Sequence, residues 1–148
     1  MITIDKIKQL REETGLSIGE CQKALKEANG DLVKAKEILR KRGQDFAKKR
    51  IEKEAGQGII ENYIHPGKKI GTMLELRCES DFVAKSDSFQ KLAHELCLQI
   101  AAISPEETEL LEQPWIKDES KIIKELIEEH IAKFGENIIL KRFIRYEL

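Results

Sequence analysis

Apolar and polar residues alternate from residue 70 to residue 78, which is the pattern of a half-buried β-strand. Residues 59–64 are also rich in β-branched and aromatic side chains and predict a second strand. Between the two runs, His65-Pro66-Gly67-Lys68 offers a fixed φ at proline and a positive φ at glycine, which favours a type II turn. The segment therefore predicts an antiparallel hairpin. The expected inner face carries Ile70, Leu74, Leu76 and Cys78.

Helical spacing follows this hairpin and recurs near the C-terminus. The first run extends to about Ile103, and the second ends at Gly135, a residue type that favours a helix C-terminus. Alternation returns in residues 138–148. These runs predict a three-stranded antiparallel sheet packed with helices. The apolar helix positions are Phe89, Leu92, Ala93, Leu96, Cys97, Ile100, Ile123, Leu126, Ile127, Ile131 and Phe134. The last strand is expected to place Ile138, Leu140, Ile144, Tyr146 and Leu148 on one face.

Two short segments lie between these elements. Residues 104–107 predict a short helix, because Pro105 suits a first helical position and Glu107 would complete a capping box. Residues 113–118 are expected to be a connector without regular structure.

The N-terminal part of the chain has a different pattern, with three short amphipathic runs. A capping box of Ser17 and Glu20 opens the second, and Asn29-Gly30-Asp31 separates it from the third, which we expect Gly43 to end. Residues 44–56 predict a charged helical linker. The sequence therefore indicates an α+β protein with a three-helix unit (1–43), a linker helix (44–56) and an α+β core (57–148).

Composition limits the possible functions. The 148 residues carry a net charge of −1, so the chain as a whole lacks the charge of a general polyanion binder. No apolar run approaches the roughly 20 residues of a membrane helix, and we expect no membrane partner. Three scattered cysteines indicate a reducing, cytoplasmic environment rather than a disulfide framework.

One basic segment stands out within this balanced composition. Between Lys34 and Lys53 the chain has nine basic residues against three acidic ones. Such a run is typical of a solvated helix face, and a contact with nucleic acid is the other interpretation. Phe46 is the only aromatic residue in the segment, so it lacks a stacking platform for bases.

The sequence contains no pattern that predicts an enzyme active site. His65, His94 and His130 lie far apart, and none has a cysteine or carboxylate at a metal-ligand spacing. A phosphate-binding glycine loop and a nucleophile elbow are also missing. We therefore expect neither catalysis of covalent chemistry nor a bound metal or cofactor.

The junction of the second predicted strand and the following helix carries the most specific motif. In Cys78-Glu79-Ser80-Asp81-Phe82-Val83-Ala84-Lys85, both Ser80 and Asp81 are good helix N-caps. Position alone favours Phe82 as a core aromatic beneath the sheet, although such a turn could also project it outward.

The segment from Ser80 to Lys85 resembles the signature turn of the elongation factor Ts family. Three further stretches, spread over the chain, carry the same resemblance. They are Leu10-Arg11-Glu12-Glu13-Thr14-Gly15, then Cys21-Gln22-Lys23-Ala24-Leu25 with Glu27-Ala28-Asn29-Gly30-Asp31, and Ile131-Ala132-Lys133-Phe134-Gly135-Glu136-Asn137-Ile138. The order and joint presence of these motifs make the resemblance specific, and it implies that the N-terminal three helices form a bundle like that of ubiquitin-associated (UBA) domains.

This resemblance implies a guanine-nucleotide exchange factor for the GTPase elongation factor Tu. Asp81, Phe82, Val83 and Ala84 would form the turn that enters the partner and disturbs its Mg²⁺ and phosphate site. In the N-terminal unit, the resemblance assigns partner contacts to Arg11, Ile18 and Gly19.

Many family members have a longer middle at the place that residues 104–118 bridge here. The resemblance to short family members, which dimerise, implies a homodimer through the sheet domain. Two other functions remain open at this point. One is a UBA-like module that binds peptides without exchange activity, and the other is an RNA-associated translation factor that uses the basic segment.

Overall fold

The N-terminal third of the computed structural model, which describes all 148 residues, contains helices α1 (Ile4–Thr14), α2 (Ile18–Glu27) and α3 (Leu32–Arg50). Each helix begins after a capping residue, Thr3, Ser17 or Asp31, whose side-chain oxygen accepts a backbone N–H bond of the first turn. These caps satisfy donors that short helices would otherwise leave unpaired. The helices share a small core of Leu10, Cys21, Ala24, Leu25, Ala28, Ala35 and Leu39.

Helix α3 continues through Gly43 to Arg50, so the prediction that Gly43 ends this helix was wrong. Gly43 is buried where α3 crosses α6 (Ile123–Phe134), and a Cβ atom there would lie 3.2 Å from the Cβ of Ala132. A glycine inside a helix costs roughly 1 kcal/mol relative to alanine. Here it permits a close approach of two helices, which local sequence does not reveal. The division into domains at residues 43 and 56 stays a prediction.

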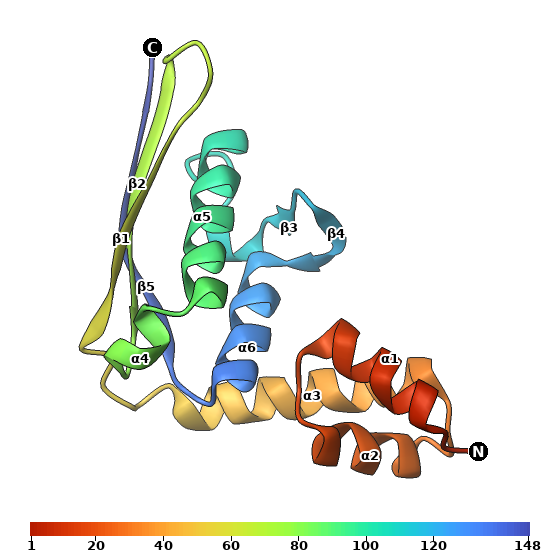
Figure 1. Ribbon diagram of the computed structural model, residues 1–148. Helices are drawn as coiled ribbons and strands as arrows, with labels where there is room; N and C mark the ends of the chain where they lie inside the picture. The colour runs from red at the N-terminus through yellow and green to blue at the C-terminus, as the bar shows by residue number, and fades with distance from the viewer.

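The C-terminal two thirds contain a three-stranded antiparallel sheet in the order β1 (Gln57–Ile64), β2 (Ile70–Cys78), β5 (Ile138–Glu147). The predicted hairpin and its type II turn are confirmed, since Gly67 has a φ of 91° and Lys68 N–H donates to the His65 carbonyl at 2.9 Å. The hairpin tip and the C-terminal end of β5 extend beyond the helices (Figure 1).

Helix α5 (Asp87–Ala102) covers one face of this sheet, and α6 packs beside it (Figure 1). The fully buried Phe89, Leu92, Leu96 and Ile100 of α5 meet Leu74, Leu76 and Cys78 of β2 in the main core. The predicted α+β architecture, with N-terminal helices followed by a helix-packed antiparallel sheet, is therefore confirmed.

The opposite face of the sheet has no covering element. Register places Met73 opposite Ile144 and Gly71 opposite Tyr146 on this face. Ile60 and Ile64 of β1 extend it. We call Ile60, Ile64, Met73, Ile144 and Tyr146, which are all exposed, the outer apolar face.

A β-bulge changes which residues of β5 reach this face. Glu75 pairs with Arg142 whereas Leu76 pairs with Leu140, so Lys141 has no partner in the ladder. One extra residue reverses the facing of every later side chain. Ile138 and Leu140 therefore face the helices, but Ile144 and Tyr146 do not, and the prediction of one shared face was wrong.

The inward position beyond the bulge is taken by Arg145. Its guanidinium donates to the carbonyl oxygens of Ile100 and Ala101 at 2.9 and 3.1 Å. These carbonyls belong to the last turn of α5, where a cation and hydrogen-bond donor is favourable.

The two short segments between the elements also differ from expectation. Residues 104–107 form a single turn closed by Glu107 N–H and the Ser104 carbonyl, not a helix, and a 3₁₀ helix η1 (Leu110–Glu112) follows. The expected connector contributes to a small ribbon of β3 (Pro114–Trp115) and β4 (Asp118–Ile122). None of the helices combines the length and apolar character that crossing a bilayer requires.

Candidate partner-binding turn

The candidate site is a four-residue helix, α4 (Asp81–Ala84), that directly follows β2. Ser80 is its N-cap, because the Ser80 hydroxyl oxygen accepts the Val83 N–H bond at 3.2 Å. Phe82 has 83% of its surface exposed, so the interpretation of this residue as a core aromatic was wrong. The turn instead presents a benzyl ring to solvent.

The other three predicted site residues of this turn divide between its two sides. Asp81 is exposed and its carboxylate lies 3.6 Å from the Lys85 ammonium. Val83 and Ala84 are buried in the main core. Their side chains attach the turn to the core, so only the side chains of Asp81 and Phe82 are available to a partner.

Glu136, at the corner between α6 and β5, holds the start of this turn. One carboxylate oxygen accepts the backbone N–H bonds of Glu79 and Ser80 at 3.1 and 2.9 Å. The other accepts the Ser80 hydroxyl at 2.6 Å. Hydrogen bonds to a charged acceptor are about twice as strong as neutral ones, so the strand-to-helix corner is firmly fixed.

A second cluster ties the same corner to the end of α3. The Arg50 guanidinium donates two hydrogen bonds to Glu79, both of 2.8 Å, and Asn137 N–H donates to the same carboxylate at 2.5 Å. The buried Asn137 amide donates to the carbonyls of Ile51 and Lys53 at 3.3 and 2.9 Å. The sequence patterns indicated no role for Arg50, Glu79, Glu136 or Asn137, although the last three lie in the quoted motifs.

The Glu79 carboxylate is stabilised in its charged form by this cluster. The hydrogen bond from Arg50 is the largest influence, and it holds the pKa of Glu79 below its usual value while raising the pKa of Arg50. Protonation of Glu79 would remove the ionic part of the link between α3 and the turn.

This link predicts acid sensitivity at the Arg50–Glu79 pair. A carboxyl whose pKa is lowered by folding stabilises the native state above its unfolded pKa of about 4.3, and the stabilisation is lost as pH falls through the folded pKa. We expect Glu79→Gln to reduce thermal stability at pH 7 and to flatten its decline below pH 4.5, as measured by calorimetry. A variant with an unchanged decline would show that another carboxyl controls acid unfolding.

The N-terminal candidate residues lie on the surface around the connection between α1 and α2. Arg11 is exposed and forms no ion pair, and Ile18 has 51% of its surface exposed. A Cβ atom on Gly19 would meet no atom within 4 Å. The three residues therefore form an open surface that a partner can reach.

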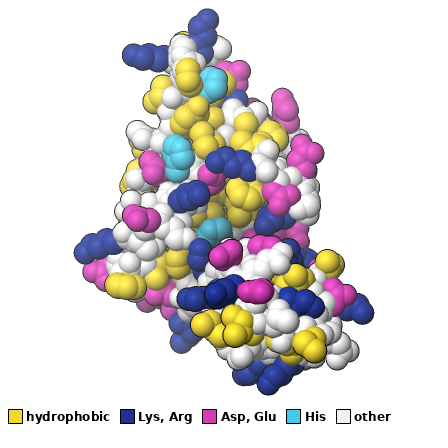
Figure 2. Space-filling view, turned by 45° about the vertical axis from the view of Figure 1, so that its right-hand side comes forward, with side chains coloured by type: hydrophobic (Ala, Val, Ile, Leu, Met, Phe, Trp, Pro, Cys, Tyr) yellow, Lys and Arg dark blue, Asp and Glu magenta, His cyan; other side chains and the backbone are white.

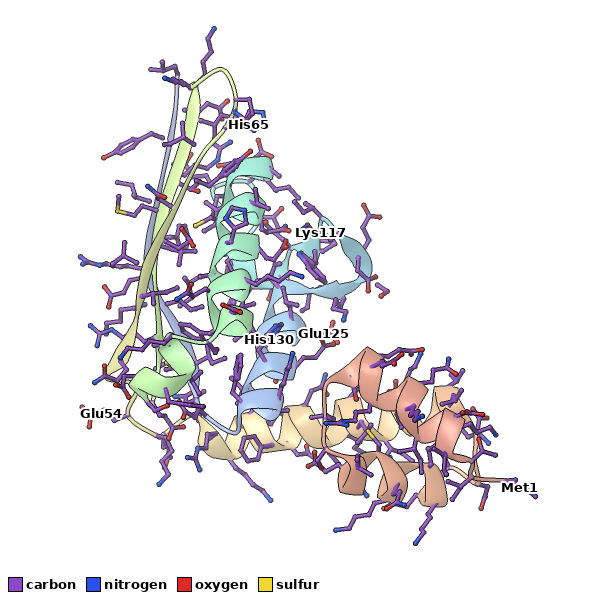
Figure 3. All side chains as sticks on the ribbon, viewed as in Figure 1. Met1, Glu54, His65, Lys117, Glu125 and His130 are labelled. Carbon is purple, nitrogen blue, oxygen red and sulfur yellow. The ribbon has the colours of Figure 1, made fainter.

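Helix α3 runs from the helical unit to the region of the turn (Figure 3). Met1 lies at the far end of the helical unit, whereas Glu54, shortly after α3, lies beside α4. The structure thus brings together Asp81 and Phe82, and separately Arg11, Ile18 and Gly19, but not the two sets.

The basic segment is partly neutralised by ion pairs within the fold. Four of its nine basic residues form ion pairs: Lys36 with Glu13, Arg40 with Glu37 and Glu125, Arg42 with Glu27, and Arg50 with Glu79. In the face shown by Figure 2, basic and acidic side chains are interspersed over the helical unit. Intramolecular pairing of this kind favours the solvated-face interpretation over a nucleic-acid site.

The histidines and cysteines have structural surroundings. The His130 Nδ1–H donates a 2.8 Å hydrogen bond to the Leu126 carbonyl, and burial lowers the pKa of His130. All three thiols are unpaired and buried, and burial raises the pKa values of Cys78 and Cys97 to about 11. A thiol is a poor nucleophile in this state. No cluster of three or more potential metal ligands occurs.

Comparison with known proteins gives a consistent result. A family model described as elongation factor TS matches residues 79–148, which include the turn and the Glu136 corner. An elongation factor Ts of Coprothermobacter proteolyticus is 40% identical over 193 aligned positions that cover 99% of this chain and 98% of the relative. One from Moorella thermoacetica is 39% identical over 194 positions, covering 100% and 96%. One from Thermodesulfovibrio yellowstonii is 40% identical over 192 positions, covering 99% and 96%.

These alignments also reveal a difference in length. They extend over 192–194 positions although this chain has 148 residues, so about 45 positions of each relative have no counterpart here. Because nearly the whole of both chains is covered, the difference is internal. Its location in residues 104–118 stays a prediction.

Proposed function

The chain belongs to the elongation factor Ts family of translation elongation factors, and from this membership we propose that it is a guanine-nucleotide exchange factor for elongation factor Tu. In this proposal it acts in the cytoplasm, binds the GDP-loaded GTPase and promotes GDP release. It performs no covalent chemistry, and the Mg²⁺ ion concerned belongs to the partner.

The observation that carries the proposal is the exposure of Phe82 on a fixed turn. Burial of a large exposed aromatic side chain against a partner lowers the free energy of the complex, and such residues are typical binding hot spots. The rigid turn prevents Phe82 from being buried within its own chain. The same turn belongs to the segment that matches the family model. Phe82 would enter the nucleotide site of the partner and disturb the Mg²⁺ and phosphate arrangement.

Asp81 would bring a negative charge to the same place. The structure assigns the capping role to Ser80 and leaves the Asp81 carboxylate exposed, so Asp81 is free for an electrostatic role. A carboxylate beside a phosphate-bound cation changes the local field, because bound cations are often the largest charges in such sites.

Binding by the turn alone is too weak to empty the GTPase. Fully burying a phenylalanine contributes roughly 1.5–3 kcal/mol, whereas moving an equilibrium from mostly loaded to mostly empty takes about 5.5 kcal/mol of differential binding. The proposal therefore needs the second surface at Arg11, Ile18 and Gly19. Together the two surfaces would hold different parts of the GTPase.

A homodimer is the second part of the proposal, and the outer apolar face supports it. Five large apolar side chains on an otherwise uncovered sheet face favour burial against another surface. A second copy presents the same face, which suits a two-fold symmetric interface of two stacked sheets. The partner copy would then provide the cover that no element of this chain supplies.

A nucleotide-release experiment tests the exchange activity. Elongation factor Tu loaded with a fluorescent GDP analogue is mixed with the purified chain and excess GDP in a stopped-flow instrument. We expect release to accelerate with increasing chain concentration and to saturate. Binding without any acceleration would contradict the proposal and favour the binding-module alternative.

A further inference from the structure

We propose that Glu136 is a positioning residue for exchange, which holds α4 in the orientation that projects Phe82. This inference rests on the proposed function. Glu136 lies on the α6–β5 corner, and it contacts the residues that precede Phe82 rather than Phe82 itself. Its effect on a partner would therefore pass through the turn.

The contacts of Glu136 converge on the point where the chain changes from β2 to α4. Three donors within two consecutive residues, the N–H groups of Glu79 and Ser80 and the Ser80 hydroxyl, are bound by one carboxylate. Each of these donors lies past the end of the sheet ladder, so the strand partner cannot satisfy it. A carboxylate accepts all three at once because it has two oxygens and no hydrogen to donate.

Glu136 also determines how Ser80 acts as a cap. The Ser80 hydroxyl donates its hydrogen to Glu136, which leaves its oxygen free to accept the Val83 N–H bond. The hydroxyl rotor is thus fixed in the orientation that α4 needs. Phe82 lies between Ser80 and Val83, so this pair of bonds brackets the exposed ring.

The position of Glu136 is itself well determined. Gly135 ends α6 with a φ of 71°, and the buried Asn137 is bonded to the end of α3 and to Glu79. Glu136 is therefore fixed by its neighbours on both sides in the sequence. A support of this kind can set the direction of a side chain on the short helix next to it.

The test is a double-mutant cycle of Glu136→Ala and Phe82→Ala in the GDP-release assay with the full chain. We expect Glu136→Ala to lower the second-order rate of stimulated release by about 5- to 30-fold when Phe82 is present. In the Phe82→Ala background the same change should lower it by less than 2-fold, because no ring remains to be positioned. Equal losses in both backgrounds, or no loss when Phe82 is present, would overturn the proposal.

Glu129→Ala is the matched control. Glu129 is a glutamate on α6 that pairs with Lys121, away from the turn, and its removal should leave the release rate within 2-fold of wild type. Glu136→Gln keeps acceptors for the backbone N–H groups and should recover part of the lost rate. A glutamine variant as slow as the alanine variant would count against positioning by these hydrogen bonds.

Amide hydrogen exchange supplies a measurement that does not depend on the partner. In Glu136→Ala, we expect the amides of Glu79, Ser80 and Val83 to exchange at least 10-fold faster, with those of β2 and α5 unchanged. Unchanged exchange at the turn would overturn the positioning role. If the wild-type chain fails to accelerate GDP release, the proposed function fails, and this measurement still decides whether Glu136 orders the turn.

Discussion

Replacing Phe82 with alanine should slow stimulated GDP release by about 10- to 100-fold and leave the stability of the chain unchanged. Burying a phenylalanine is worth roughly 1.5–3 kcal/mol, and each 1.36 kcal/mol corresponds to a tenfold change in rate. Because 83% of Phe82 is exposed, its removal takes little from the core. Stopped-flow release of a fluorescent GDP analogue measures the first effect, and thermal unfolding measures the second.

Leu111→Ala provides the comparison for this variant. Leu111 is a large apolar residue on η1 that is also partly exposed, and it belongs to neither candidate surface. Its removal should leave the release rate within 2-fold of wild type. A Phe82→Ala variant that releases GDP as fast as wild type would remove Phe82 from the mechanism, whatever its fold.

A lysine in place of Ile144 should convert the proposed homodimer to a monomer. Ile144 lies opposite Met73 on the outer apolar face, and the nearby Glu75 carboxylate is already paired with Arg77 and Arg142, so the ammonium would enter a two-sheet interface without a free acidic partner. An unpaired charge in a buried interface costs several kcal/mol, and we expect the dimer dissociation constant to rise at least 100-fold. Light scattering measures the change in mass. It is recorded at roughly 1–50 μM chain, because the dimer population depends on protomer concentration.

The exposed position of Ile144 in one chain makes this variant informative. The isolated subunit should keep its melting temperature to within about 4 °C, because the substituted side chain faces away from the core. Lys91→Glu on α5 changes charge on the helix side of the sheet and should leave the dimer intact. A wild-type chain that is monomeric over the whole range, or a dimeric Ile144→Lys variant, would contradict the proposed interface.

Local chemistry explains the parts of the fold that the sequence predicted well. The turn at Gly67 and the helix end at Gly135 both need a positive φ, and glycine marks such positions directly. Ser17 and Asp31 mark helix starts for a similarly local reason, since their side chains bond the next turn. Signals that act within four residues can be read without the rest of the molecule.

Long-range contacts explain where the sequence misled. Gly43 looks locally like the end of a helix. It is a glycine because the close crossing with α6 leaves little room for a side chain there. The bulge at Lys141 depends on the register with β2 and has no local marker. The exposure of Phe82 also depends on distant contacts. Val83 and Ala84 pack into the main core, and this packing directs the Phe82 ring outward.

The continuous helix α3 has a consequence for a partner that would bind both proposed surfaces, the turn and the N-terminal surface. Its 19 residues, at roughly 1.5 Å each, give a rod of about 28 Å. One end of the rod is packed into the helical unit, and Arg50 at the other end is bonded to the residue before Ser80. The α1–α2 connection, which carries the N-terminal surface, packs beside the middle of this rod and against Lys133 of α6. The spacing between the two surfaces is therefore fixed by the fold and shorter than the rod, and a protein that occupies both must match it. Selectivity then comes from distance as well as from the chemistry of each contact.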